Sequence, residues 1–470
     1  MTRIAAIDQG TTSTRVLLIE EDGTAQLRHA VRHEQHYPRP GWVEHNPLEI
    51  LKNIRECIEA AGEVQAIGLD NQGESCLAWD GITGEPLTPI IVWQDNRTSE
   101  RIASLRAEGA EQLTLSRAGL PLDAYFSASK LGWIMQNIDA ARQALKAGRL
   151  RLGTTDAFFL DRLTGCYVTD VTTASRTSLM NIASGTWDPE LCELFGVPVE
   201  ALPEIRPTTG AIGFIGRALL TASVVDQQAA LFGHGCRRPG EAKITFGTGA
   251  FALVLTGPDI IRKPDQGLLP TVAWNVGGQT QFALDGGVYN AGSAVEWGMR
   301  IGLLNQVSEL AEFASPPAIS RGLAFVPALS GLACPHWDRS ASALWIGMST
   351  ETTRSDMCQA LLEGIALRTA EVIAAMDEHI EISEAISIDG GLTRSAYFVQ
   401  FLADCLARPL VIPSSDELTA LGCAELASLG FGCGTVRRAG DVTCVEPRIG
   451  KPEVWLETFA EAVARTRKWR

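Results

Sequence analysis

Short apolar runs followed by glycine-rich polar turns recur three times along the chain. The turns at residues 8–12, 247–249 and 389–391 each follow an apolar run of the kind that forms a buried strand. The first two turns also lead into a second apolar stretch, at 16–19 and 251–255. Glycine lets backbone N–H groups approach oxygen atoms closely, and threonine hydroxyls add uncharged donors. We therefore expect three loops, from two related halves, to close around one polyanionic ligand.

The spacing of apolar residues elsewhere predicts the remaining elements. Thr353 and Asp356 have the spacing of a capping box, which predicts the start of a long amphipathic helix. The rest of the pattern predicts helices at 47–61, 395–407 and 452–470, buried strands at 66–69 and 90–93, mainly helical structure at 99–147, and loops with short strands at 165–220.

The length of 470 residues exceeds what one core supports and predicts two domains. A helical run ends near residues 237–240, where the second strand–turn–strand pattern begins. We therefore predict an N-terminal domain at 1–238, a C-terminal domain at 239–434 and a helical tail at 435–470.

Composition narrows the class of protein. A formal net charge of -15 argues against a broad surface for nucleic acid or for an anionic membrane, since both need clustered Lys and Arg. The eleven cysteines include no Cys-x-x-Cys pair, which argues against a disulfide framework or a structural zinc site. Asp8 interrupts the first apolar run, so no signal peptide fits, and the apolar stretch at 244–255 is too short to span a membrane. We expect a cytoplasmic enzyme, and a homodimer is compatible with the sequence.

Asp8 ends the first apolar run, two residues before Gly10. A carboxylate at the end of a buried strand is costly without a cation. Mg²⁺ that bridges ATP phosphates supplies such a cation, mostly through water. Taken alone, Asp8 is better explained as a turn residue that caps its own loop. The two further glycine-rich turns favour the metal.

Asp226 stands at a strand-to-helix junction and is followed by Gln227 and Gln228. A helix N-terminus keeps a nearby carboxylate ionised. Such a group can accept a proton from a substrate hydroxyl late in phosphoryl transfer. An ordinary N-cap aspartate explains most acids in this position. The two adjacent amides suit hydrogen bonding to a polyol, and they favour a catalytic base.

Six runs, spread over nearly the whole length of the chain, form a pattern that is shared with a known family. They are residues 7–13, 37–45, 92–98, 226–233, 247–249 and 389–391. In these runs the chain resembles the FGGY family of carbohydrate kinases, and within that family it is most similar to the glycerol kinases. It implies an α/β fold in which two RNase H-like domains, of the actin, Hsp70 and sugar-kinase ATPase superfamily, flank a central cleft. The implied reaction transfers the γ-phosphoryl group of ATP, with Mg²⁺, to a primary hydroxyl of a small polyol, first of all glycerol.

The resemblance also implies that the N-terminal domain binds the polyol and carries the catalytic base, that the C-terminal domain binds the nucleotide, and that individual residues have assigned roles. Asp226 falls on the catalytic base and Asp8 on the Mg²⁺-associated aspartate. The implied acceptor pocket comprises Gly73, Glu74, Trp93, Tyr125, Asp226, Gln227 and Phe251. The implied nucleotide-binding residues are Thr11, Thr12, Ser13, Arg15, Thr248, Gly292, Glu296, Gly391, Leu392 and Ser395. Core packing alone would be the simpler account of Trp93 and Phe251. Together with the other implied pocket residues, Trp93 and Phe251 would form apolar walls for a carbon chain, while the Glu, Gln and Asp side chains form hydrogen bonds with its hydroxyls.

Two single residues and one segment depart from the family pattern. Gly73 stands where the glycerol kinases carry an arginine, so either another group replaces the guanidinium or the pocket accepts a longer polyol or ketose. The segment at 210–225 is short and lacks the basic, glycine-rich loop that binds a phosphorylated-sugar regulator. Glu296 occupies a position where a glutamine commonly faces the nucleotide.

The leading hypothesis is an ATP-dependent kinase that makes glycerol 3-phosphate. One alternative is a kinase for a longer acceptor such as erythritol, a tetrulose or a pentulose. Another is a catalytically weak nucleotide or sugar sensor, which the presence of Asp226 disfavours, because a sensor has no need of a base. We expect a small polyol or sugar as the substrate that binds together with ATP and Mg²⁺, with no nucleic acid and no membrane insertion.

Overall fold

The first glycine-rich turn joins two strands of an antiparallel hairpin, β1 (Ile4–Gln9) and β2 (Ser13–Ile19). Every residue of β1 is buried, as expected for a strand that is covered on both faces. The second turn joins β15 (Ala242–Phe246) and β16 (Ala250–Gly257) in the same way. The predicted repetition is confirmed in the computed structural model, which describes residues 2–20, 22–262, 267–434, 441–467 and 469.

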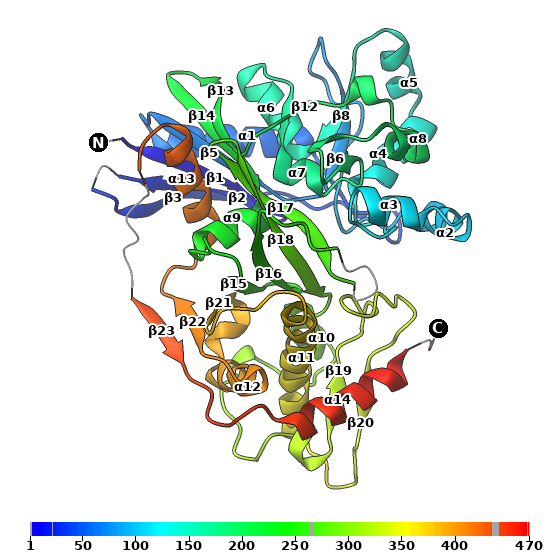
Figure 1. Ribbon diagram of the computed structural model, residues 1–470, viewed down its shortest axis with the longest axis vertical. Helices are drawn as coiled ribbons and strands as arrows, with labels where there is room; N and C mark the ends of the chain where they lie inside the picture. The colour runs from blue at the N-terminus through cyan, green and yellow to red at the C-terminus, as the bar shows by residue number, and fades with distance from the viewer. Residues whose placement is uncertain (1, 21, 263–266, 435–440, 468, 470) are drawn as a thin grey trace.

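The first hairpin belongs to a six-stranded sheet in the order β13-β14-β5-β1-β2-β3, which defines the N-terminal lobe (Figure 1). The added strands are β3 (Ala25–Arg32), β5 (Ala66–Asn71), β13 (Thr209–Ile215) and β14 (Ala218–Val225). Helices α1 (Pro47–Ala61) and α6 (Thr155–Thr164) share one hydrophobic core on one face of this sheet. β5 runs parallel to both β1 and β14, so the carboxyl ends of these three strands lie side by side.

The second hairpin belongs to a seven-stranded sheet in the order β17-β18-β16-β15-β21-β22-β23, which defines the C-terminal lobe. Its other strands are β17 (Leu269–Val276), β18 (Gln279–Val288), β21 (Ile386–Gly390), β22 (Leu410–Pro413) and β23 (Val442–Val445). Its helices are α10 (Gly292–Arg300), α11 (Arg354–Asp377) and α12 (Ala396–Leu406), and a short pair is formed by β19 (Ala324–Val326) and β20 (Leu344–Ile346). In both sheets the central strand lies between its hairpin partner and a parallel strand. The predicted pair of RNase H-like domains is confirmed.

A second, smaller sheet and most of the helices of the N-terminal lobe come from β4 and from the chain between β5 and β13. A four-stranded sheet has the order β4-β7-β6-β8, with β4 (Glu44–His45), β6 (Cys76–Asp80), β7 (Ile90–Ile91) and β8 (Leu150–Thr154). The predicted helical region holds α2 (Ser99–Ala107), α3 (Glu111–Arg117), α4 (Ser127–Asn137) and α5 (Asp139–Lys146). The region predicted as loops and short strands holds β9 (Val168–Asp170), α7 (Val171–Ser175), β10 (Met180–Asn181), β11 (Thr186–Trp187), α8 (Pro189–Phe195) and β12 (Glu204–Arg206).

Helix α13 (Leu418–Gly430) follows the C-terminal sheet in sequence but packs against β1, β5 and β14 of the N-terminal sheet (Figure 1). It also packs closely on α9 (Asp226–Gly233) through glycine. A Cβ atom on Gly422 would lie 1.9 Å from the carbonyl oxygen of Ala229, so a larger residue would separate the two helices. The domain boundary at 238/239 stays a prediction. Helix α13 belongs to the predicted C-terminal unit 239–434 by its position in the sequence, but it covers the sheet of the N-terminal lobe.

The predicted helical tail contains a strand as well as a helix. β23 extends the C-terminal sheet by pairing with β22, and α14 (Glu453–Thr466) packs on β19. Residues 435–440 of that predicted tail lie outside the described residues. Within the described part of the chain, no helix has the length and apolarity needed to cross a membrane. The cytoplasmic location and the homodimer stay predictions.

Candidate active site

Three carboxylates meet where the central strands of the N-terminal sheet end. Asp8 lies at the end of β1 directly opposite Asp70 on the parallel strand β5. Asp226 follows the last residue of β14, whose Val224 pairs with Asp70. Burial and the nearby carboxylates of Asp8 and Asp226 raise the pKa of Asp70 well above its ordinary value. The sequence analysis passed over Asp70, although its position at a strand end resembles that of Asp8.

Asp226 is the first residue of α9, and Val225 is the N-cap. The alternative in which Asp226 merely caps the helix is therefore wrong, since its carboxylate accepts a hydrogen bond only from the neighbouring Gln227 N–H, at 2.7 Å, in the described part of the chain. Burial, Glu74 and Asp8 raise the pKa of Asp226 to about 7. A carboxylate with that pKa exchanges a proton near neutral pH, as a general base must.

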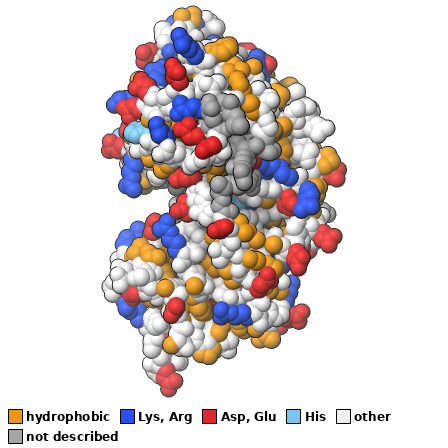
Figure 2. Space-filling model, turned by 90° about the vertical axis from the view of Figure 1, so that its left-hand side faces the viewer, with side chains coloured by type: hydrophobic (Ala, Val, Ile, Leu, Met, Phe, Trp, Pro, Cys, Tyr) orange, Lys and Arg blue, Asp and Glu red, His pale blue; other side chains and the backbone are white. Residues whose placement is uncertain are grey.

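Asp226 opens on a cavity of about 170 Å³ between the two lobes, and Figure 2 shows the surface notched between them. Both predicted groups of residues contribute to its wall. From the acceptor group these are Gly73, Glu74, Trp93, Tyr125, Gln227 and Phe251, and from the glycine-rich turns they are Thr11, Gly247, Thr248 and Gly249. The fold thus brings all seven predicted acceptor residues together beside two of the three turns.

The aromatic residues of this cavity are fixed by contacts with each other and with the first turn. Trp93 and Tyr125 pack edge to face, with ring centroids 5.6 Å apart. The indole Nε1 of Trp93 donates a hydrogen bond to Thr11 Oγ1 at 3.1 Å. All three side chains are partly exposed at the cavity, so they are not simple core residues. Trp93 also packs against the core of the N-terminal lobe, so core packing accounts for part of its contacts and the cavity for the rest.

Glu74 is buried and held by a cation that the sequence analysis missed. Its backbone is left-handed, with φ 58°, and its Oε1 accepts a hydrogen bond from Arg176 Nε at 2.6 Å. Arg176 also forms an ion pair with Asp285 of the C-terminal lobe, with Nη2 2.9 Å from Oδ2. Burial raises the pKa of Glu74, whereas the Arg176 charge lowers it. Nothing in the local sequence of the short-element region marked Arg176, because both partners are distant in the chain.

Lys243 is a second buried cation beside the cavity. It lies on β15, and its Nζ donates hydrogen bonds to Gln227 Oε1 at 2.6 Å and to Thr245 Oγ1 at 3.0 Å. Because the carbonyl oxygen of the Gln227 side chain is engaged, its NH₂ group remains as the donor for a ligand. Burial lowers the pKa of Lys243, whereas the carboxylates of Asp389 and Asp226 raise it.

The second glycine-rich turn abuts the N-terminus of α10. Gly292 N–H donates to the Gly247 carbonyl oxygen at 2.9 Å, and a Cβ atom on Gly292 would lie 2.5 Å from that oxygen. Thr12, Thr248 and Gly391 are exposed, and Ser13 is partly exposed. These residues are accessible to a nucleotide, and their predicted roles stay predictions.

Other predicted nucleotide residues are engaged within the protein. Arg15 Nη1 lies 3.0 Å from Glu417 Oε2, and its Nε lies 3.9 Å from Asp8 Oδ2. Leu392 is buried in the C-terminal core, and Ser395 Oγ caps α12 while donating to the Leu310 carbonyl oxygen at 2.7 Å. A nucleotide contact from Leu392 or Ser395 would have to come from the backbone. Glu296 is exposed on α10.

The surroundings of Asp8 fit a cation such as Mg²⁺. Asp8 is 8% exposed, and its ion pair with Arg15 is long at 3.9 Å. Burial raises the pKa of Asp8, and the Arg15 charge and a hydrogen bond with Asp70 offset this only in part, so its ionised form is incompletely compensated within the protein. No cluster of three or more metal-ligating side chains occurs among the described residues. Asp8 is therefore suited to a metal that brings its own water and phosphate ligands.

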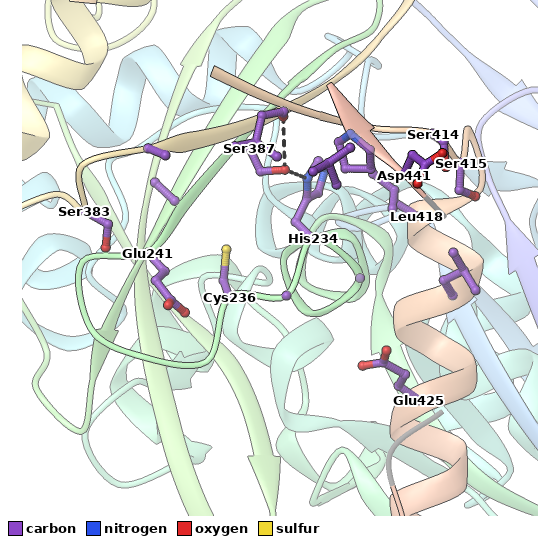
Figure 3. Close-up of a pocket in the computed structure, with 18 of the residues that line it drawn as sticks. His234, Cys236, Glu241, Ser383, Ser387, Ser414, Ser415, Leu418, Glu425 and Asp441 are labelled. Atoms are coloured by element: carbon purple, nitrogen blue, oxygen red, sulfur yellow. Dashed lines mark hydrogen bonds between the residues drawn. The ribbon is translucent and has the colours of Figure 1, made fainter. Parts of the chain in front are cut away.

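A larger cavity, of about 790 Å³, lies between α9, β21, β22 and α13 and contains none of the predicted site residues. Figure 3 shows His234, at the end of α9, directed at Ser387 on β21, and the distance from its Nδ1 to Ser387 Oγ is 2.6 Å. His234 Nε2 also lies 3.4 Å from Asp389 Oδ1, in the third glycine-rich turn. His234 therefore links the helix that carries Asp226 to that turn.

Comparisons with known proteins agree with this geometry. The family model for the N-terminal domain of the FGGY family of carbohydrate kinases matches residues 3–233, and the model for the C-terminal domain matches residues 242–431. The chain is 40% identical to a glycerol kinase of Alkalilimnicola ehrlichii, over 100% of this chain and 99% of that protein. It is 41% identical to a glycerol kinase of Haloferax volcanii, over 92% of this chain and 90% of that protein.

Solved structures give the same relationship. Plasmodium falciparum glycerol kinase with ADP superposes with a TM-score of 0.90 at 31% identity, covering 99% of this chain and 98% of that one. Xylulose kinase from Rhodospirillum rubrum superposes with a TM-score of 0.85 at 26% identity, covering 98% of each chain. Two matched domains in order, full-length relatives and a shared fold establish that the chain belongs to the FGGY family of carbohydrate kinases.

Proposed function

We propose that the protein transfers the γ-phosphoryl group of ATP to a primary hydroxyl of glycerol, giving glycerol 3-phosphate and ADP. The observation that carries the proposal is the cavity of about 170 Å³, whose wall combines Asp226 and Glu74 with the turns at Thr11 and Thr248. Phosphoryl transfer requires a base, a hydroxyl and a phosphate chain in one enclosed space. The glycerol kinases among the similar proteins support the choice of acceptor.

In this proposal the cavity wall holds the acceptor by its carbon chain and by its hydroxyls. The rings of Trp93, Tyr125 and Phe251 pack against carbon. The carboxylate of Glu74 accepts hydrogen bonds from hydroxyls, and the Gln227 NH₂ group, oriented by Lys243, donates one. These contacts place one terminal hydroxyl at Asp226.

Asp226 then accepts the proton of that hydroxyl while the oxygen forms its bond to the γ-phosphorus. The bond between that phosphorus and the bridging oxygen breaks, and ADP leaves with the electron pair. The turns at 8–12 and 247–249 present backbone N–H groups and Thr hydroxyls to the phosphates. Asp8 would hold Mg²⁺ through water, and the bound ion supplies positive charge to the phosphate oxygens. Closure of the lobes excludes water, which would otherwise take the phosphoryl group.

A coupled assay of ADP release over an acceptor panel tests the proposal. Glycerol should give the highest kcat/KM among glycerol, erythritol, tetruloses, pentuloses and pentitols, and the product should be glycerol 3-phosphate by mass and by chromatography. Release of ADP that does not depend on any acceptor, or binding of nucleotide and glycerol without turnover, would contradict it. The second of these results is the one expected of a sensor.

One observation favours a second candidate, a kinase for a longer polyol or ketose. A neighbouring cavity of about 280 Å³ shares Trp93, Tyr125, Phe251 and Asp285 with the acceptor cavity. Gly73 lines the acceptor cavity without contributing a side chain to its wall, which leaves space for an acceptor of four or five carbon atoms. The same panel separates the two candidates by the acceptor with the highest kcat/KM.

A further inference from the structure

Arg176 is a buried cation at the junction of the two neighbouring cavities. It contributes to the wall of the cavity of about 170 Å³ and to that of the cavity of about 280 Å³. Its side chain is 5% exposed. Because a guanidinium cannot lose its proton in a protein, a full positive charge is present at this junction.

The hydrogen bonds of Arg176 leave part of the guanidinium unused. Nε donates to Glu74 Oε1 at 2.6 Å, and Nη2 lies 2.9 Å from Asp285 Oδ2. Nη1 is buried and has no hydrogen-bond partner among the described residues. An unpaired buried donor carries a free-energy cost that a ligand oxygen would remove. The aromatic rings of Tyr125 and Phe126 lie beside the guanidinium, with centroids 5.9 Å and 5.7 Å from Cζ, and Nη1 forms no hydrogen bond with the Tyr125 hydroxyl.

Position 73 is next to Glu74 and carries no side chain. Gly73 does not have a left-handed backbone, so glycine is not required there by conformation. A Cβ atom would meet only the methyl groups of Val225, at ordinary contact distances of 3.6 Å. The space next to the Cα atom of Gly73, beside Glu74, is therefore open to a side chain. The guanidinium that binds Glu74 comes instead from Arg176, which is distant in the chain.

We propose that Arg176 is an acceptor-binding residue, which donates a hydrogen bond to a hydroxyl of the polyol that is not phosphorylated. The inference rests on the proposed function and specifies the acceptor as a polyol in which this second hydroxyl is required. Arg176 replaces, from a different place in the chain, the guanidinium that position 73 lacks. Glu74 accepts from the same part of the polyol, and Asp226 receives the hydroxyl that reacts.

The ion pair with Asp285 makes this contact depend on the closed arrangement of the lobes. Arg176 and Glu74 belong to the N-terminal lobe, whereas Asp285 lies on β18 of the C-terminal lobe. The orientation of Nη1 is thus set by one carboxylate from each lobe. An acceptor that bonds to Arg176 therefore stabilises the arrangement in which ATP and acceptor face each other.

The test compares KM and kcat for glycerol, propane-1,2-diol and propane-1,3-diol in the wild type, Arg176→Met and Arg176→Lys. Each diol lacks one hydroxyl of glycerol. Loss of a charged hydrogen bond should raise KM for glycerol by roughly tenfold or more in Arg176→Met, while KM for ATP changes by less than about threefold. The preference of the wild type for glycerol over one of the two diols should shrink by a similar factor. Arg176→Lys keeps the charge, so its KM for glycerol should lie between those of the wild type and of Arg176→Met.

Arg339→Met is the matched control. Arg339 also joins the lobes, with Nη2 3.1 Å from Asp123 Oδ1, and it lines only the cavity of about 280 Å³. This variant should leave the ratio of glycerol to diol unchanged even if KM rises. If Arg176→Met unfolds, the ratio in Arg176→Lys decides. An unchanged ratio in a folded Arg176 variant overturns the inference while the wild-type activity still supports the proposed function; an inactive wild type would contradict the proposed function itself.

Discussion

Lys243 Nζ lies 2.6 Å from Gln227 Oε1, so a buried cation of the C-terminal lobe orients the residue that follows Asp226. Its charge also lowers the pKa of Asp226. The lysine therefore influences both Gln227 and Asp226, which the proposed function assigns to acceptor binding and to proton transfer, although it lies outside their motif in the sequence. Both effects are accessible to measurement.

Substitution Lys243→Met should raise KM for glycerol and move the acidic limb of the kcat/KM profile to higher pH. The amide of Gln227 loses its orientation, and Asp226 loses a cation that favours its ionised form. A pH series of initial rates measures both effects. Lys243→Arg, which keeps the charge, is the control and should move the limb less. If the limb of Lys243→Met stays in place, Lys243 has no influence on the base.

The wild-type rate should depend on pH through Asp226. Burial and the carboxylates of Glu74 and Asp8 raise its pKa from the ordinary value of an aspartate to about 7. The base acts in its ionised form, so kcat/KM should rise as pH increases through about 7 and then level off. Initial rates between pH 5.5 and 9 (a range of roughly two units on either side) at saturating Mg·ATP measure the limb. A rate that is flat across this interval would show that another group takes the proton.

Substitution Asp8→Ala should weaken productive use of Mg·ATP far more than binding of glycerol. The carboxylate lies at the end of β1 beside the first glycine-rich turn, where in the proposed mechanism it would act on the water shell of a bound Mg²⁺. KM for Mg·ATP, the Mg²⁺ dependence of the rate and equilibrium binding of glycerol separate the two effects. Equal loss of both affinities, with a lower melting temperature, would indicate a folding defect instead.

Substitution Gly73→Arg should shift the preference toward glycerol at the expense of longer acceptors. The backbone at 73 can carry a side chain, and a guanidinium there would fill the open space beside Glu74. The extra contacts or clashes are worth about 1–3 kcal/mol, or about 5- to 150-fold in the ratio of kcat/KM values. Measurements with glycerol and erythritol in both proteins give this ratio. No change would mean that position 73 does not face the acceptor.

The sequence predicted the hairpins because they are local. The runs that form β1 and β2, and the turn between them, lie within residues 4–19, and glycine and threonine at fixed offsets mark them. Asp8 and Asp226 were likewise predictable from their positions at strand ends. The predicted helix cap at Thr353 is confirmed for the same reason, and the helix predicted at 395–407 is present as α12, with Ser395 as its N-cap.

Arg176 and α13 could not be predicted in the same way. The two residues of the Arg176–Glu74 hydrogen bond are separated by 102 positions, and no local spacing records such a contact. Helix α13 is largely buried along its length, with apolar residues on more than one face. Such a pattern shows that a helix is covered, but it does not show which sheet covers it.

The most direct test of the central claim compares the wild type with Asp226→Asn. Asp226 is the first residue of α9, and its carboxylate is partly exposed in the wall of the acceptor cavity. Single-turnover formation of glycerol 3-phosphate at pH 8 should fall by roughly a hundredfold or more, the usual size of a general-base contribution. Affinity for ATP should be retained, and the melting temperature should be equal or higher, because a buried charge is removed. Near-normal phosphoryl transfer in this folded variant would contradict the account.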